Sequence, residues 1–263
     1  MKGPVQPRLE WWGMTCGGMT AAYLLLIVAM LVATATYSSP QDLWAALMKP
    51  EIRYAIWLSL ATCTATAVLA LLLAVPVGYL LSRARFHGKA WLDAALDIPI
   101  VLPPMVVGLC LLILFQTPIG RAVEHVVPFT YTVAGVVLAQ FVIGASFAVR
   151  TMRGTFDNLS SRPEEVAMTL GCSRAQAFGL VTLPAARRGM FAAASIAWAR
   201  SLGEFGPVLV FAGATRMKTE VLPTTVWLEL SVGNLEAAIA VSLLMVLLAM
   251  VILAAVRLAG EHI

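Results

Sequence analysis

Two residues of opposite charge interrupt an apolar stretch of this chain of 263 residues. Arg200 and Glu204 stand four positions apart, and side chains at this spacing lie on one face of an α-helix, where they can form an ion pair. Ionised groups inside a membrane are costly and are candidates for function. One interpretation is an intrahelical pair that lowers the cost of both charges. The other is a pathway or gate, in which Arg200 offsets the charge of an anion and Glu204 helps to close the pore.

Prolines interrupt a second apolar stretch. Pro99, Pro103 and Pro104 are followed by Gly108. Each proline removes a backbone hydrogen bond, which a membrane helix tolerates where protein or water satisfies the freed groups. The pattern predicts a kink. We weigh a kink beside a translocation pathway, with Pro103 and Pro104 as its residues, against a kink that serves packing alone.

A polar segment of 40 residues, 150–189, carries six arginines and three acidic residues. Within it, Ser161 can cap a helix whose first turn holds Pro163, Glu164 and Glu165. Proline and carboxylates are favoured there, because the first backbone N–H groups lack partners and the helix dipole is positive at that end. The segment is long enough to contain helices of its own.

The same segment contains signals for a turn and a second helix. Gly171 is expected to end the first helix, because glycine readily adopts the left-handed conformation that follows a helix. Ser173 is expected to cap the next helix, which would end before Leu183-Pro184. The pattern predicts a compact helical knob, and an amphipathic linker lying on the membrane surface is the alternative.

The sequence lacks the residue patterns that metal binding, nucleotide binding or catalysis needs. Four cysteines and three histidines are scattered and form no CxxC pair, so they predict neither a metal site nor a disulfide framework. The phosphate-binding pattern Gly-x-x-x-x-Gly-Lys-Ser/Thr does not occur. No cluster of His, Asp, Glu and Ser marks a catalytic site at the ends of neighbouring apolar stretches. We therefore expect no catalytic residue, no metal and no cofactor on this chain.

The elements that position these residues follow from the composition. Hydrophobic residues make up 60% of the chain and charged residues only 12%, against about 25% charged in an average soluble protein. The mean hydropathy is +0.87. Such a chain cannot cover a soluble surface, and it is too apolar to be disordered. The net charge of +4 is too small and too scattered for a nucleic-acid-binding face. The composition indicates an integral membrane protein.

Six stretches reach the roughly 20 apolar residues that an α-helix needs to cross a bilayer. We predict an all-α membrane protein with spans at Thr20–Tyr37, Tyr54–Leu81, Ala94–Phe115, Thr132–Val149, Met190–Gly213 and Ala237–Val256. We expect one permease domain, 1–263, with a core at 54–256 and a peripheral segment at 1–53.

Lysines and arginines set the orientation of the spans, since they are enriched in cytoplasmic segments. With the amino terminus inside, twelve of the 18 basic residues fall in cytoplasmic segments and five in external ones. Both termini are therefore predicted to be cytoplasmic. The polar segment 150–189 then lies in the cytoplasm, between the fourth and fifth spans.

The spacing of residues in that segment resembles the EAA motif of the permeases of ATP-binding cassette (ABC) importers. The family pattern is Glu-Ala-Ala, three residues, Gly, nine residues, an aliphatic residue, one more residue and Leu-Pro. Here it is matched by Glu165-Val166-Ala167, Gly171, Val181 and Leu183-Pro184. The departures are Val166 in place of the first alanine and Val181 in place of isoleucine.

The resemblance implies that this helix is a coupling helix, which docks in a cleft of a separate ATPase subunit. The residues that it assigns to this contact are Glu164, Glu165, Val166, Ala167 and Gly171. Glu165 is the expected polar contact, and stabilisation of the helix dipole is its alternative role. ATP and Mg²⁺ would be bound by the ATPase and not by this chain.

Three further stretches resemble the molybdate and tungstate permeases, with the sulfate and thiosulfate permeases next. They are Leu102-Pro103-Pro104 with Val107-Gly108, Ala199 to Gly206, and Lys218 to Pro223. The resemblance implies a multi-pass protein of the bacterial or archaeal plasma membrane. It also implies two ATPase subunits, a second copy of this permease and an external solute-binding protein, with lipid around the assembly and no nucleic acid. An ion-coupled secondary transporter is the alternative from another class. It would need intramembrane carboxylates or inverted repeats for ion coupling, and the sequence offers Glu204 as the sole such carboxylate and no visible repeat.

Overall fold

The computed structural model describes residues 8–37, 39–84 and 86–262 of the chain. These residues form helices, with no strand among them. The longer helices are α1 (Arg8–Tyr37), α3 (Pro50–Arg83), α4 (Lys89–Val101), α5 (Pro104–Gln116), α7 (Val133–Asn158), α11 (Arg187–Leu202) and α13 (Leu235–His262). The shorter ones are α2 (Pro40–Leu47), α6 (Pro118–Val126), α8 (Arg162–Thr169), α9 (Arg174–Ala177), the π-helix η1 (Phe178–Thr182), α10 (Leu183–Ala185), the π-helix η2 (Val208–Ala212) and α12 (Leu222–Ser231).

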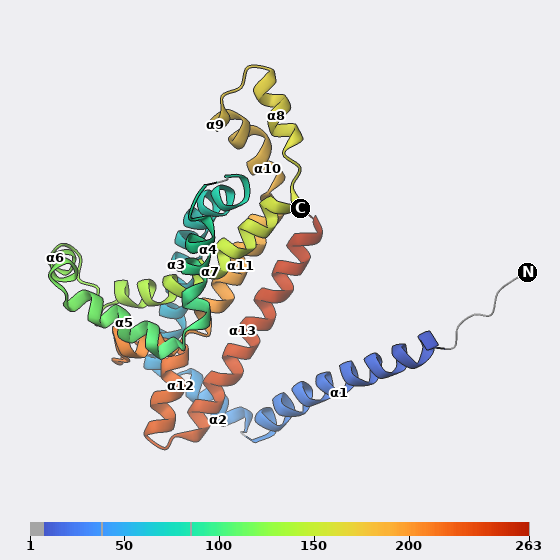
Figure 1. The fold of residues 1–263 in the computed structure, drawn as a ribbon. Helices are drawn as coiled ribbons and strands as arrows, with labels where there is room; N and C mark the ends of the chain where they lie inside the picture. The colour runs from blue at the N-terminus through green and yellow to red at the C-terminus, as the bar shows by residue number, and fades with distance from the viewer. Residues whose placement is uncertain (1–7, 38, 85, 263) are drawn as a thin grey trace, which may run out of the picture.

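Helices α3, α7 and α11 form the centre of the bundle (Figure 1). Their contact is built from small buried residues, which let helix backbones approach closely in a membrane. These residues are Ala67, Ala70, Ala74, Ala145, Ala148, Ala193 and Ala197. At Gly78 the backbones of α3 and α7 approach closely, because a Cβ atom there would lie 2.8 Å from the Cβ of Met152 and 2.9 Å from the backbone N of Arg153. The core is therefore held by close backbone packing of small residues.

Four helices in the described residues are long and apolar enough to cross a membrane, namely α1, α3, α7 and α13. The bent pair of α4 and α5 can count as a fifth span. The prediction of an all-α membrane protein is confirmed at this level. Helix α7 runs on to Asn158, so the fourth apolar stretch continues as a helix into the polar segment.

The third and fifth predicted spans are interrupted where a single helix was expected. Helix α4 ends at Val101, and α5 begins at Pro104 with an axis turned by 112°. This angle is far larger than a proline kink, because Pro103 and Pro104 follow each other and the chain is extended at Leu102 and Pro103. In the fifth stretch α11 ends at Leu202, and helical structure resumes only at 206.

The two ends of the bundle carry different short helices. Helices α8, α9 and α10 project from one end, while α2 and α12 lie at the other (Figure 1). Helix α1 extends away from the bundle, and no residue of its most apolar 18-residue window is buried. Helix α2 is different, since Ala46 is buried in a cluster with residues of α12 and α13.

Candidate functional site

Helices α8 to α10 with η1, residues 162–185, form a protruding unit that we call the coupling segment. Glu164 is buried within it, with 6% of its surface exposed. Its carboxylate accepts a hydrogen bond from the hydroxyl of Tyr79 on α3 and another, of 2.8 Å, from the hydroxyl of Thr182 in η1. Glu164 therefore ties α8 to α3 and to the return path of the segment, and it faces inward.

The outer side of α8 is made of the residues that follow. Glu165 is exposed, Val166 is 55% exposed and Leu170 is 81% exposed. Ala167 is half-buried. The structure thus separates the two neighbouring glutamates that the sequence analysis placed in one contact: Glu165 lies on the free face, and Glu164 lies beneath it.

The turn between α8 and α9 follows the predicted chemistry. Gly171 has a φ of +97°, in the left-handed region that glycine adopts without strain. Ser173 caps α9, since its hydroxyl accepts from the backbone N–H of Gln176 while the Gln176 side chain accepts from the N–H of Ser173. At the start of α8, by contrast, Ser161 makes no side-chain capping hydrogen bond.

The second helix of the coupling segment does not stop before Leu183-Pro184. The chain continues from α9 through the π-helix η1 into α10, which begins at Leu183. A proline is tolerated there because it occupies the first turn of a new helical stretch, where its missing N–H costs nothing. The widened turn of η1 buries Thr182, which allows its hydroxyl to reach Glu164.

The two interrupted spans meet at their interruptions. A Cβ atom on Gly108 would lie 2.8 Å from the Cα of Pro207, and one on Gly206 would lie 2.9 Å from the backbone N of Met105. Only glycine permits such an approach of two backbones. Pro103 and Pro104, predicted from the sequence as pathway residues, are both exposed at the start of α5. The structure therefore brings together two segments that are about 100 residues apart in the chain.

Arg200 and Glu204 lie beside this contact and form the predicted pair. The guanidinium Nη2 of Arg200 is 2.8 Å from Oε1 of Glu204. The two atoms form an ion pair, but their orientation is not that of a hydrogen bond. The Glu204 side chain is 1% exposed and that of Arg200 is 35% exposed. The guanidinium carbon also lies 5.6 Å from the centroid of the Phe147 ring on α7, within the range of a cation–π contact. Glu204 follows the end of α11, so the pair joins the last turn of α11 to the break after it and does not lie within a continuous helix.

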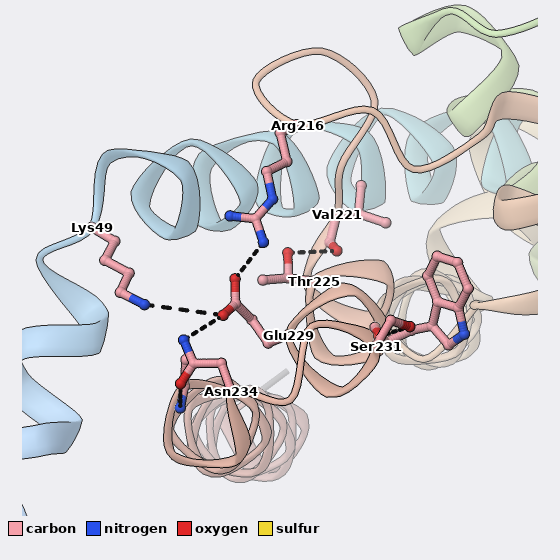
Figure 2. A network of polar contacts seen from close by, with 9 residues as sticks. Lys49, Arg216, Val221, Thr225, Glu229, Ser231 and Asn234 are labelled. Carbon is pink, nitrogen blue, oxygen red and sulfur yellow. Dashed lines mark hydrogen bonds and ion pairs between the residues drawn. The ribbon is translucent and has the colours of Figure 1, made fainter.

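A second buried carboxylate lies at the end of the molecule that carries α2 and α12. Figure 2 shows Glu229 of α12 between Lys49, Arg216 and Asn234, which come from three different parts of the chain. Arg216 donates at 2.8 Å and the Asn234 amide at 2.7 Å, while Lys49 lies 4.0 Å away. We call these four residues the outer network. It joins the start of α3, the loop 213–221 and the turn between α12 and α13.

The loop 213–221 is fastened to the bundle by polar contacts next to this network. The backbone N–H of Leu222 donates to the Ser59 hydroxyl at 2.8 Å, and the Tyr54 hydroxyl donates to the carbonyl of Lys218 at 3.3 Å. Glu220 is fully buried, and neither of its carboxylate oxygens has a hydrogen-bond partner in the structure. Burial raises the pKa of Glu220 above its usual value, and the neighbouring Thr225 hydroxyl and the charge of Arg216 oppose that rise.

The sequence analysis missed the outer network. Its signal was present, since Glu229 is the single charged residue in the stretch Leu222–Ser231. The basic partners gave no such signal, because Lys49 and Arg216 stand in polar connections where lysine and arginine are common.

The described residues contain no group of three or more His, Cys, Asp or Glu side chains placed to hold a metal ion. Cys16, Cys63, Cys110 and Cys172 are free thiols.

Comparison with known proteins gives a consistent result. The family described as "Binding-protein-dependent transport system inner membrane component" matches residues 70–262. A molybdenum transport system permease protein, ModB, of Mycobacterium tuberculosis is 37% identical over 229 residues, which is 86% of each chain. A probable molybdenum ABC transporter permease protein of Haloferax volcanii is 33% identical over 96% of this chain and 91% of its own. A sulfate transport system permease protein, CysT, of Escherichia coli is 32% identical over 83% and 80%, respectively.

Two solved structures share the fold. One is a bacterial ABC transporter involved in the import of alginate, with a TM-score of 0.77, 15% identity and 97% of both chains covered. The other is a bacterial alginate ABC transporter in complex with an alginate pentasaccharide-bound periplasmic protein, with a TM-score of 0.72, 14% identity and coverage of 93% of this chain and 92% of that one.

Proposed function

The chain belongs to the family of binding-protein-dependent transport system inner membrane components, and we propose that it forms the membrane pathway of an ABC importer for molybdate or tungstate. It is a multi-pass inner-membrane protein of a bacterium or an archaeon. The observation that carries the choice of anion is the 37% identity to a molybdenum permease over 86% of both chains. Sulfate is the second candidate, because the sulfate permease matches almost as much of the chain at 32% identity.

Energy for transport comes, in this proposal, from a separate ATPase subunit that binds ATP and Mg²⁺ and is present in two copies. The coupling segment supports this, because α8 exposes Glu165 and Val166, and the turn after α8 exposes Gly171. Ala167 lies half-buried behind them, and Glu164 anchors the helix from below. This chain itself remains non-catalytic, since its sequence lacks the phosphate-binding pattern of such ATPases.

A second copy of this chain and an external solute-binding protein complete the proposed assembly. Helix α1 supports the second copy, because no residue of its most apolar window is buried in its own bundle, so this surface needs either lipid or another protein around it. The solved complex of a bacterial alginate ABC transporter with a periplasmic protein, which shares this fold, supports the binding protein.

We further propose six membrane crossings with both termini in the cytoplasm. The four long apolar helices supply four crossings. The bent pair α4 and α5 supplies the fifth, and α11 with the helical stretch that resumes at 206 supplies the sixth. The excess of basic residues on one side supports the orientation. The core of the single permease domain would then span residues 54–256.

The contact between the two interrupted spans is the proposed gate. Transport by alternating access needs a segment with two arrangements, and irregular backbone at membrane depth occurs where it lines a cavity or is buried in protein. Pro103 and Pro104 free backbone groups on one side of this contact, and the Arg200–Glu204 pair lies on the other. Movement of the ATPase clefts would shift the coupling segment and, through the bundle, open this contact. In this scheme Arg200 offsets the charge of the passing anion.

Two measurements test the proposal. Uptake of radiolabelled molybdate, tungstate and sulfate is measured in cells that express the chain with its ATPase and binding protein, before and after ATP depletion. Molybdate or tungstate uptake that requires ATP supports the proposal, whereas uptake driven by a proton gradient after ATP depletion supports a secondary transporter. Deletion of residues 164–173 should leave the protein in the membrane and abolish its co-purification with the ATPase.

A further inference from the structure

A polar cavity of about 540 Å³ lies between the end of α3 and the coupling segment. Its volume falls within the range of about 300–1,000 Å³ that is usual for small-molecule sites. The other large cavities of the described residues have almost entirely apolar walls, as expected for surfaces in contact with lipid chains. We call this one the coupling cavity. It is lined by Tyr79, Leu80, Ser82, Arg83, Ala84, Lys89, Ser161, Glu164, Glu165, Met168 and Arg174.

Three cations converge on the coupling cavity from three elements. Arg83 ends α3, Lys89 begins α4 and Arg174 begins α9. None of the three forms an ion pair with a carboxylate of the described chain. Arg83 donates from Nη2 to the carbonyl of Leu159, and Lys89 makes only a long contact of 3.4 Å with the carbonyl of Ala84. None of these three positive charges is therefore paired directly with a carboxylate of the described residues.

Two carboxylates also line the cavity, and they do not cancel the three cations. The Glu164 carboxylate already accepts two hydrogen bonds, from Tyr79 and from Thr182. Glu165 is exposed on the face of α8. The formal charge of the lining is thus +1, with both arginines and the lysine still able to donate.

Two further donors lie in the wall without any acceptor. The Ser82 hydroxyl and Nε of Arg83 are shielded from water and have no hydrogen-bond partner. A buried donor without a partner costs about 1–3 kcal/mol, so each of these two groups calls for an acceptor that the described chain does not supply. The Ser82 hydroxyl reaches new acceptors by rotation about one bond. An oxygen-rich anion in the cavity would supply such an acceptor.

The side chains around the cavity place it at the membrane surface. Trp91 is 82% exposed and Phe86 is 39% exposed, and both are close in sequence to Lys89. Aromatic residues gather at the level of the lipid headgroups, and basic pockets between membrane helices at the cytoplasmic side hold lipid phosphates.

We propose that the coupling cavity binds a tetrahedral oxyanion of the phosphate type through Arg83, Lys89 and Arg174. Its two possible sources are the headgroup of an anionic phospholipid and a free oxyanion of the cytoplasm. Such a ligand joins the end of α3 to the start of α9, beside α8. It therefore adds to the attachment of the coupling segment that Tyr79 and Glu164 already provide. This inference adds a site to the proposed function and does not depend on the identity of the transported anion.

The test uses the complex of permease and ATPase, purified in detergent and stripped of lipid. Native mass spectrometry measures the binding of phosphatidylglycerol and of phosphatidylcholine, and thermal unfolding is followed with increasing inorganic phosphate. Lys89→Gln and Arg174→Gln are compared with wild type, because both side chains lack an ion pair and their loss should leave the fold intact. Arg188→Gln, on an exposed position of α11 outside the cavity, is the matched control.

We expect each cavity variant to weaken binding about ten-fold or more, as the loss of one charged hydrogen bond does, and the control to bind as wild type. Selective binding of phosphatidylglycerol without an effect of phosphate supports the lipid source. Stabilisation by phosphate that the two variants lose supports the free anion. The inference is overturned if neither ligand binds, or if Arg188→Gln weakens binding as much as the cavity variants. Co-purification of the ATPase in the same preparations reports separately on the proposed function.

Discussion

The hydroxyl of Tyr79, one turn from the end of α3, donates to the carboxylate of Glu164 in the first turn of α8. The two residues are 85 positions apart, and their contact joins a central helix of the bundle to the coupling segment. The Tyr79 ring also packs edge-on against Phe156 of α7 and Phe178 of η1. One side chain thus connects the coupling segment with two helices of the core.

Loss of this hydroxyl should uncouple ATP hydrolysis from anion uptake in the proposed complex. In Tyr79→Phe the ring packing stays, while a charged hydrogen bond of about 1.5–3 kcal/mol is removed. We expect ATPase co-purification to persist and uptake to fall several-fold, with more ATP hydrolysed for each anion transported. Tyr54→Phe removes a hydroxyl at the opposite end of α3 and serves as the control. Equal uptake in both variants would contradict the coupling role of the Tyr79–Glu164 contact.

The Arg200–Glu204 pair should be asymmetric in its response to mutation. Arg200→Gln leaves a buried carboxylate without its cation and is expected to cost about 3–5 kcal/mol. Glu204→Gln should cost less, because Arg200 is 35% exposed and retains its contact with Phe147. The double variant should recover part of the stability, as measured by thermal unfolding in detergent. If both single variants transport normally and lose only stability, the pair does not act in the gate.

Backbone contact at the proposed gate should make two glycines sensitive to a single methyl group. A Cβ atom at Gly206 or Gly108 would meet backbone atoms of the facing segment at 2.8–3.0 Å, so Gly206→Ala and Gly108→Ala must push the two breaks apart. We expect both variants to lose most uptake. Gly203→Ala is the control, since its Cβ would meet no atom closer than 3.8 Å. Normal uptake by Gly206→Ala would show that the two interrupted spans do not need this contact.

Burial of Glu220 predicts a dependence of stability on pH. Because its folded pKa lies above the usual 4.5, the protonated form is the one that the fold favours. Its contribution to stability is therefore full below about pH 4.5 and is lost as the pH rises through the folded pKa. Glu220→Gln should remove this loss, so its unfolding temperature should exceed that of wild type most at high pH. Glu236→Gln, on the exposed start of α13, controls for the change in net charge. An identical pH profile for wild type and Glu220→Gln would refute the prediction.

Much of the fold was predictable because long apolar stretches have few alternatives in a membrane. The helices that cross without interruption agree with the sequence, as α3 and α7 show. The breaks were harder to locate. Pro103 and Pro104 indicate an interruption of the helix, but the angle of 112° between α4 and α5 depends on what packs against α5. The end of α11 at Leu202 has only Gly203 as a local signal, because Arg200 and Glu204 have the spacing of an unbroken helix.

Within the candidate site, the turn at Gly171 and the cap at Ser173 were read correctly, whereas the cap at Ser161, the stop before Leu183-Pro184 and the long-range partners were not. Gly171 and Ser173 act within a few residues of themselves, so their conformations follow from the sequence. The inward position of Glu164 depends on Tyr79 and Thr182, which lie 85 and 18 positions away. Periodicity within α8 cannot reveal such partners. A single sequence shows which side chains carry charge, and the fold decides which charges meet.

Helix α3 is hydrogen-bonded to structural elements at both ends of the bundle. Near one end, the Ser59 hydroxyl receives the N–H of Leu222, and near the other, Tyr79 holds Glu164. The two attachments are 20 residues apart, or about 30 Å along the helix at 1.5 Å per residue. Because an α-helix is stiff along its axis, we expect a displacement of the coupling segment at Tyr79 to be transmitted along α3 to Ser59 and the start of α12. Pro76, the only proline inside α3, lies between the two attachments. Because prolines are the usual sites of helix kinks, we expect any bending of α3 between the attachments to occur at Pro76.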